Sequence, residues 1–235
     1  MFLHGPWGLR DREFLDHLTA HRVYAPRHPG TSAGDPDAIH ALDELWDLVV
    51  YYGELFDRLS LRAPRLVGHS FGGMVACEIA ATMPERVSKL VLIDPLGLWH
   101  DNLPVKNWMI LPEDEPRAAL FTDPSGVAAQ RFFELPADPQ ARAEAQAGFI
   151  WSQACTGKFV WPLPDRGLKK RMHRIAVPTL IIWGRADSVI SPAYACEFTQ
   201  RIHSARAELI DKAGHLPHLE RPHEVAELVN RFLAD

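Results

Sequence analysis

The chain has 235 residues, long enough for one α/β domain with a modest insertion, and its 47% hydrophobic and 23% charged content is ordinary for a soluble globular protein. Its net charge of −5 argues against nucleic acid or an anionic membrane as a partner. No apolar run approaches the roughly 18 residues that a membrane span needs, so we expect no membrane segment.

The start of the sequence and its cysteines point to the cytoplasm. Met1 is followed at once by strand-like residues, without the basic region and apolar stretch of a signal peptide. The three cysteines are scattered and form no CxxC pair, as expected of reduced thiols. Among the twelve histidines, the cluster of His215, His218 and His223 lacks a recognised zinc spacing. We therefore expect neither a metal nor a cofactor.

The first quarter of the chain alternates helical and strand-like segments. Arg10 to Ala20 carries apolar residues on one face and predicts a helix, and Val23 to Ala25 predicts a strand that Pro26 stops. Turn signals continue to Asp37. An apolar stripe from Ile39 to Leu59 then predicts a long helix.

The stretch RLVGHSFGG, from Arg65 to Gly73, is the centre of the chain's organisation. Its first residues end a short apolar run that indicates a buried strand, and from Phe71 the apolar spacing becomes helical. Between strand and helix stands the G-x-S-x-G sequence GHSFG, with Ser70 at its middle. A serine at such a sharp turn takes a strained backbone conformation and projects its hydroxyl. The N–H of Phe71, at the helix start, would point at an anion formed on a substrate attacked there.

The remainder of the chain continues the alternation after one interruption. Further strands are predicted at 87–93, 178–183 and 207–210, and helices at 191–202, with Ser191 as N-cap, and at 222–233. The interruption, 99–176, holds helical pieces separated by prolines and is rich in tryptophan and phenylalanine. Because strands alternate with helices and are continuously apolar, we expect an α/β fold: a mostly parallel sheet with helices on both faces.

Four motifs, in order, resemble those of the α/β-hydrolase fold superfamily: LHGPWG near the start, GHSFG at the turn, WGRADSVIS late in the chain and AGHLPHLERP near its end. The resemblance covers nearly the whole chain and is nearest to carboxylesterases and meta-cleavage-product (C–C bond) hydrolases. It implies an α/β-hydrolase core at residues 1–98 and 177–235 and a helical cap at 99–176. The superfamily usually carries two strands before the HG loop, which this chain apparently lacks.

The resemblance also implies an oxyanion hole. In the superfamily the residue after HG supplies the second N–H, but here that residue is Pro6, which has none. Either the N–H of Trp7 takes this role through a shifted loop, or the hole rests on Phe71 with weaker help.

Ser70, Asp187 and His215 follow one another in the superfamily's order, and each comes where a strand has just ended. An imidazole can take the serine proton and return it to the leaving group, and a carboxylate fixes the imidazole's tautomer. Asp94 also follows a strand and is the alternative acid, but Asp187 lies in the WGxxD loop where the superfamily carries it. His218 is the alternative base, three residues beyond the AGH junction.

A serine at the turn, rather than an aspartate, implies acyl transfer to water through an acyl-enzyme. We therefore expect a serine hydrolase that cleaves carboxylic esters of small hydrophobic substrates. His69 is expected in the pocket wall or in a structural role rather than as the base. Of the aromatic residues in 99–176, we expect Trp108 and Trp151 to face the substrate.

Two alternatives to the esterase remain. A C–C bond hydrolase of meta-cleavage products would need polar groups for the substrate's carboxylate and oxo functions, for which Arg117, Arg131 and Arg171 are candidates. A non-catalytic ligand receptor could also have kept the fold.

Without the superfamily's first two strands, the strand Val23 to Ala25 would lie at the sheet edge with unpaired backbone groups. Arg22 and Arg27 beside it would be its protection. We therefore expect the chain to be marginally stable or to self-associate through this edge.

Overall fold

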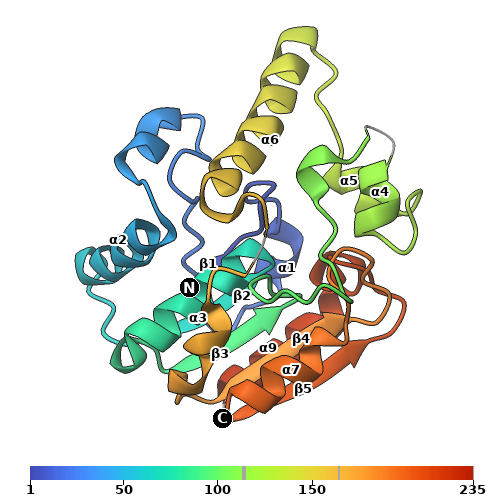
Figure 1. Ribbon diagram of the computed structural model, residues 1–235. Coiled ribbons are helices and arrows are strands. Elements are labelled where there is room, and N and C mark those ends of the chain that lie inside the picture. Colours follow the sequence, from blue (N-terminus) through green and yellow to red (C-terminus); the bar gives the residue numbers. More distant parts are fainter. Residues whose placement is uncertain (113–114, 164, 235) are drawn as a thin grey trace.

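The computed structural model describes residues 1–112, 115–163 and 165–234, and its centre is a five-stranded sheet (Figure 1). The strands are β1 (Phe2–Leu3), β2 (Arg65–His69), β3 (Lys89–Ile93), β4 (Thr179–Gly184) and β5 (Ala205–Ile210). They are hydrogen-bonded in the order β1-β2-β3-β4-β5, and every neighbouring pair is parallel. The predicted α/β class is confirmed. Because all strands run the same way, their carboxyl ends meet at one edge of the sheet, where chemistry gathers in such folds.

Helices precede, separate and follow the strands. They are α1 (Arg12–Asp16), α2 (Leu45–Arg58), α3 (Phe71–Thr82), α4 (Glu115–Leu120), α5 (Val127–Phe132), α6 (Pro139–Val160), α7 (Tyr194–Arg201), α8 (Pro217–Glu220) and α9 (Pro222–Ala234). Short 3₁₀ turns lie at Pro36–Ala41, Pro84–Arg86, Trp108–Ile110, Leu168–Lys170 and Met172–Arg174. In the described part of the chain, none of these helices combines the length and apolar composition that a membrane crossing requires.

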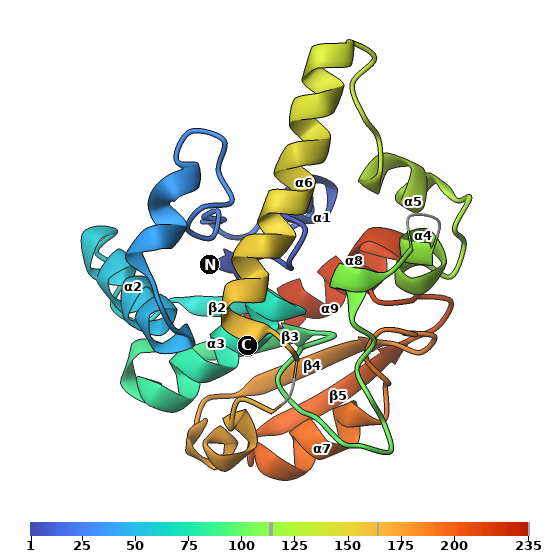
Figure 2. The ribbon, with the colours of Figure 1, turned by 45° about the horizontal axis from the view of Figure 1, so that its top comes forward.

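The segment between β3 and β4 leaves the sheet and carries α4, α5 and α6. Figure 2 shows α6 rising from the carboxyl edge of the sheet, with α4 and α5 standing beyond the same edge. The C-terminal end of α6 is held against the core, because the ring of Phe159 stacks on Phe71 at the start of α3, with 6.1 Å between centroids. The helices of this segment are therefore placed next to the turn that carries Ser70.

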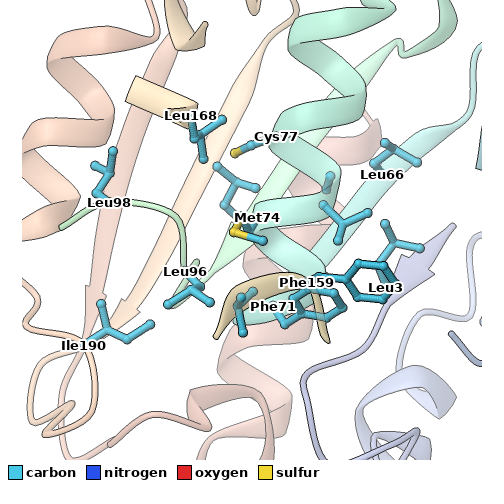
Figure 3. Close-up of a cluster of buried hydrophobic side chains, with 14 of the residues drawn as sticks. Leu3, Leu66, Phe71, Met74, Cys77, Leu96, Leu98, Phe159, Leu168 and Ile190 are labelled. Carbon is cyan, nitrogen blue, oxygen red and sulfur yellow. The ribbon is translucent and has the colours of Figure 1, made fainter. Parts of the chain in front are cut away.

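Apolar side chains cover both faces of the sheet. Strand residues alternate between them, so that Val67 and Val91 join α1 and α9 on one face while Leu66 packs under α2, α3 and α7 on the other. Figure 3 shows the second cluster, in which Met74 and Cys77 of α3 lie among leucines from the strands and loops. Burial on both faces accounts for the unbroken apolar runs of β2, β3 and β4 in the sequence.

The predicted strand Val23–Ala25 is wrong. The segment is irregular, and among the described residues its one backbone hydrogen bond to the sheet runs from the N–H of Phe2 to the carbonyl of Tyr24, at 2.8 Å. Since β1 is two residues long, it offers too few partners for a ladder, and β1 itself is the edge strand of the described sheet. The expected self-association stays a prediction.

Helix positions were predicted better than helix ends. The helix expected over Arg10–Ala20 shrinks to α1, although Phe14 is buried as its periodicity indicates. The helix expected over Ile39–Leu59 divides into a 3₁₀ turn and α2, which begins at a capping box where the Asp47 carboxylate accepts the backbone N–H of Glu44 at 2.9 Å.

The helix expected from Ser191 starts later, because α7 begins at Tyr194 with Ala193 as N-cap. The hydroxyl of Ser191 accepts the N–H of Ala193 at 3.3 Å and so closes the turn that precedes the helix.

Candidate active site

Ser70 sits in a strained turn between β2 and α3. Its φ of 51° and ψ of −114° are conformations that non-glycine residues seldom adopt. The turn is fixed from the neighbouring strand, since the Ser70 N–H donates to the carbonyl of Ile93 at 2.9 Å. The flanking glycines leave space for backbone alone: a Cβ on Gly72 would lie 2.1 Å from the carbonyl oxygen of Leu3, and one on Gly68 would lie 2.4 Å from that of Gly72. The tightness of this turn explains the G-x-S-x-G spacing.

The three predicted catalytic residues meet at the carboxyl edge of the sheet. His215 Nε2 lies 3.0 Å from Ser70 Oγ, and His215 Nδ1 lies 2.8 Å from Asp187 Oδ2. Because the carboxylate can accept but not donate, Nδ1 carries the proton and Nε2 is left free to accept the serine hydroxyl. All three residues are buried, which strengthens the electrostatic interactions between them.

The carboxylate of Asp187 is held by the loop after β4. Its Oδ1 accepts the backbone N–H groups of Val189 and Ile190, at 2.8 and 3.0 Å, and its Oδ2 also lies 3.3 Å from Nε1 of Trp183. These donors fix the plane of the carboxylate and stabilise its negative charge. Asp187 can therefore orient the imidazole of His215 without changing position itself.

Asp94, the alternative acid, lies beside this pair but in a different role. Its Oδ1 accepts the N–H of Gly184 at 2.9 Å, and its buried Oδ2 has no hydrogen-bond partner counted among the described residues. Burial, and then the nearby charge of Asp187, raises the pKa of Asp94 well above its usual range. Its surroundings therefore favour the protonated form of the Asp94 carboxyl, and the imidazole of His215 hydrogen-bonds Asp187 instead.

Replacing Asp94 with asparagine tests this assignment. We expect Asp94→Asn to keep most activity, because an amide can still accept from Gly184 and donate toward Asp187, whereas Asp187→Asn should lower kcat/KM by about 10³-fold or more.

The pH dependence of stability follows from the raised pKa of Asp94. The folded state keeps a proton on Asp94 that the unfolded state releases above about pH 4, so this residue's contribution to stability falls as the pH rises.

Thermal melts from pH 4 to 8 measure the difference. Asp94→Asn should raise the Tm by a few degrees near pH 7, and this advantage should vanish toward pH 4, where the aspartate is protonated in both states. Large loss of activity in Asp94→Asn with little in Asp187→Asn would transfer the acid role to Asp94.

His69 and His218 form a layer behind His215. His69 Nε2 donates to the backbone carbonyl of His215 at 2.9 Å, and its pKa is lowered well below its usual range by burial and then by the neighbouring imidazoles of His218 and His215. His218 Nε2 donates to the carboxylate of Asp11 at 2.8 Å. His69 thus holds the backbone of His215 in position, and His218 pairs with Asp11 rather than with Ser70.

Asp11 was missed in the sequence. It follows the HG loop, outside any apolar stripe, and no motif pairs it with a histidine 207 positions later.

The HG loop is anchored by a buried set of neutral groups. His4 donates from Nδ1 to the carbonyl of Gly5 at 2.7 Å, and His28 donates from Nε2 to the carbonyl of His4 at 2.9 Å. The Tyr52 hydroxyl donates to Nδ1 of His28 at 2.6 Å. Burial lowers the pKa of His4 to about 4, so these rings remain uncharged and fix the loop that leads to Trp7.

Two cavities lie beside the site, and the two tryptophans predicted to face the substrate line different ones. Trp108 lines a cavity of about 640 Å³, here called the α6 cavity, between α6 and the α4–α5 pair; Trp7 and Leu120 also line it. Trp151 lines a different groove, where its Nε1 donates to the carbonyl of Gly30 at 3.0 Å. The ring of Trp7 stands edge-on to that of His215, 5.8 Å between centroids, so the α6 cavity lies one side chain away from His215.

Two clusters bring three possible metal ligands together: Asp11 with His69 and His218, and Asp94 with Asp187 and His215. In both, imidazole nitrogens already donate to carboxylate or carbonyl oxygens. A metal at the second cluster would occupy Nδ1 of His215, the atom that holds Asp187. Such paired imidazoles and carboxylates suit the orientation and movement of protons.

Comparison with known proteins gives a consistent result. Residues 1–228 match the model of the alpha/beta hydrolase family. Human monoacylglycerol lipase ABHD6 is 29% identical over 237 residues, which cover 90% of this chain and 66% of that protein, so the chain spans about two thirds of this relative's length.

Solved structures share the fold. The meta-cleavage product hydrolase CumD of Pseudomonas fluorescens IP01 superposes with a TM-score of 0.77 at 20% identity, covering 99% of this chain and 89% of that chain. Naproxen esterase of Bacillus subtilis gives a TM-score of 0.74 at 20% identity, covering 99% and 82%.

Proposed function

Because the chain belongs to the alpha/beta hydrolase family, we propose that it is a serine hydrolase that cleaves carboxylic esters of small hydrophobic substrates. The observation that carries this proposal is the continuous set of hydrogen bonds from Ser70 Oγ through His215 to Asp187. The human relative is named a lipase and one solved neighbour an esterase, which supports ester cleavage over other acyl transfers.

The proposed mechanism uses these three side chains in sequence. Ser70 Oγ attacks the ester carbonyl carbon while His215 Nε2 takes its proton. The tetrahedral intermediate collapses, the bond to the alkoxy oxygen breaks, and the imidazolium returns the proton to the departing alcohol. Water then attacks the acyl-enzyme by the same route and restores Ser70. Asp187 stabilises the imidazolium throughout.

The oxyanion in this mechanism is proposed to bind two N–H groups. Phe71 is the first residue of α3, so its N–H has no acceptor within the helix and lies at the positive end of the helix dipole. The second donor is proposed to be the N–H of Trp7, since Pro6 has none. The buried hydrogen bonds of His4 and His28 support this role, because they hold the loop in place before a substrate arrives.

The helices between β3 and β4 are proposed to act as a cap, residues 99–176, over this site. Most of the α6 cavity is walled by apolar and aromatic side chains, which favours substrates with an apolar body. One observation favours the C–C bond hydrolase as a second candidate: Arg117 lines the same cavity, where it could meet a substrate carboxylate. Arg131 and Arg171 are less suited, because they pair with Glu13 and Glu78.

A substrate panel tests the proposal. The purified chain should hydrolyse p-nitrophenyl acetate and butyrate, and a fluorophosphonate should label Ser70 stoichiometrically, as mass spectrometry of the peptide would show. A dienol ketone ring-fission product, assayed in parallel, separates ester from C–C cleavage. Turnover of the ketone with none of the esters would favour the second candidate. Turnover of neither substrate, together with no labelling, would favour a non-catalytic receptor.

A further inference from the structure

Two arginines line the α6 cavity with no carboxylate partner among the described residues. Arg10, from the loop after β1, and Arg117, from α4, both contribute to its wall, and neither pairs with an acidic side chain among the described residues. The described lining residues include no aspartate or glutamate. Glu113 and Asp114 lie outside the described residues. Nearby Arg131 differs, since its Nη1 lies 2.6 Å from a carboxylate oxygen of Glu13.

Backbone carbonyls and aromatic rings hold both guanidinium groups. Arg10 donates from Nη1 to the carbonyl of Phe132 at 2.8 Å, and its Cζ lies 5.0 Å from the ring centroid of Phe149. Arg117 donates from Nη1 to the carbonyl of Ala129 at 3.2 Å, and its Cζ lies 4.6 Å from the ring of Phe133. A guanidinium has five N–H donors, so each arginine has donors to spare.

The cavity therefore concentrates positive charge in apolar surroundings. Rings against the guanidinium faces exclude water, which strengthens any interaction with an anion. Burial lowers the pKa of Arg10, the nearby charge of Arg27 lowers it further, and the charge of Asp11 raises it in part. Arginine remains protonated even so, because its ordinary pKa lies far above neutral pH.

The same cavity lies next to the proposed catalytic residues, although its lining includes neighbours of His215 rather than His215 itself. Leu120 lines it, and the backbone carbonyl of Leu120 accepts the N–H of His215 at 3.0 Å. Trp108 also lines it, and its buried Nε1 has no hydrogen-bond partner among the described residues, which leaves one more donor for a ligand oxygen. A molecule in the cavity would thus have charged donors on the α4 side and, at the other side, Trp7 and Leu120, which contact His215.

We propose that the α6 cavity is a subsite for a carboxylate on an otherwise apolar substrate, bound between Arg10 and Arg117. This inference rests on the proposed function and narrows it, from hydrophobic esters in general to those that carry a negative group remote from the scissile bond. An apolar body would pack on the phenylalanines while the carboxylate takes the unused guanidinium donors. The preference for an anion would come from these two residues.

Binding can be measured apart from chemistry by using Ser70→Ala protein. Calorimetric titration compares 4-phenylbutyrate with 4-phenylbutanamide, which share one body and differ in charge. We expect the carboxylate to bind at least tenfold more tightly, because it gains charge-assisted hydrogen bonds that the amide cannot make. Raising the salt concentration from 50 to 500 mM should weaken binding of the carboxylate and leave binding of the amide almost unchanged.

Substitutions then locate the charge. Arg117→Met and Arg10→Met should each weaken the binding of 4-phenylbutyrate by about tenfold and change the binding of the amide by less than twofold. Arg117→Lys should recover part of the lost affinity. Arg131→Met is the matched control and should change neither affinity. Binding of the amide also reports whether each variant is folded. The salt titration uses Ser70→Ala protein with both arginines intact, so it does not depend on the folding of an arginine variant.

Equal affinities for carboxylate and amide would overturn the inference. So would the absence of binding by either molecule, or equal losses in Arg131→Met and Arg117→Met. Failure of the proposed function looks different: the wild-type chain would not turn over esters, yet the carboxylate preference in Ser70→Ala would persist. Conversely, ester turnover with no carboxylate preference would remove this inference and leave the proposed function standing.

Discussion

Ser70→Ala is expected to lower kcat/KM for p-nitrophenyl esters by about 10⁴-fold or more while leaving the melting temperature near that of the wild type. The loss is large because the proposed triad members act together, and without Oγ neither His215 nor Asp187 has a nucleophile to activate. The fold should persist, since the turn is held by its backbone: the N–H of residue 70 bonds Ile93 and its carbonyl accepts from Met74 at 3.1 Å.

Ser188→Ala is the matched control, because Ser188 stands next to Asp187 in sequence, donates to the carbonyl of Ala119, and touches neither Ser70 nor His215 by a hydrogen bond among the described residues. Its activity should stay within a few-fold of wild type. Circular dichroism and thermal melts establish that both variants are folded. A Ser70→Ala protein that keeps a tenth of wild-type activity would remove Ser70 as the nucleophile.

The arrangement around Ser70 could be predicted because it depends on local sequence and on parallel strand order. Glycine is required at positions 68 and 72 because a Cβ at Gly68 or Gly72 would lie less than 3 Å from backbone atoms. This requirement produces the recognisable G-x-S-x-G spacing. Once strands run in parallel, loops after β2, β4 and β5 must meet at one edge, which brings Ser70, Asp187 and His215 together.

Other features could not be predicted because they depend on long-range contacts or on burial. The raised pKa of Asp94 arises from its burial and from the nearby charge of Asp187, which sequence spacing does not encode. Arg10 and Arg117 are more than a hundred positions apart in the sequence. The cavity that they share forms through the tertiary packing of α4 and α6. Likewise Val23–Ala25 has the composition of a strand, but whether it becomes one depends on the length of β1 beside it.

The second large effect concerns the base. We expect His215→Gln to lower kcat/KM by about 10³-fold or more, because glutamine offers no nitrogen that can take the serine proton at Nε2. His218→Gln should stay within a few-fold of wild type. His218 is buried and its Nε2 is engaged with Asp11, so its contribution is to support the loop rather than to transfer a proton.

Glutamine is the appropriate substitution at both positions, because its amide can still donate near the position of Nε2. An alanine at 218 would remove the side-chain hydrogen-bond partner of Asp11 Oδ1, which costs about 1–3 kcal/mol in stability for a buried polar group, and would confuse unfolding with loss of catalysis. We therefore expect His218→Ala, but not His218→Gln, to lower the melting temperature strongly. Steady-state kinetics and melts on the three variants separate the roles. Full activity in His215→Gln with loss of activity in His218→Gln would transfer the base role to His218. The hydrogen bond between Asp187 and His215 would then need a different explanation.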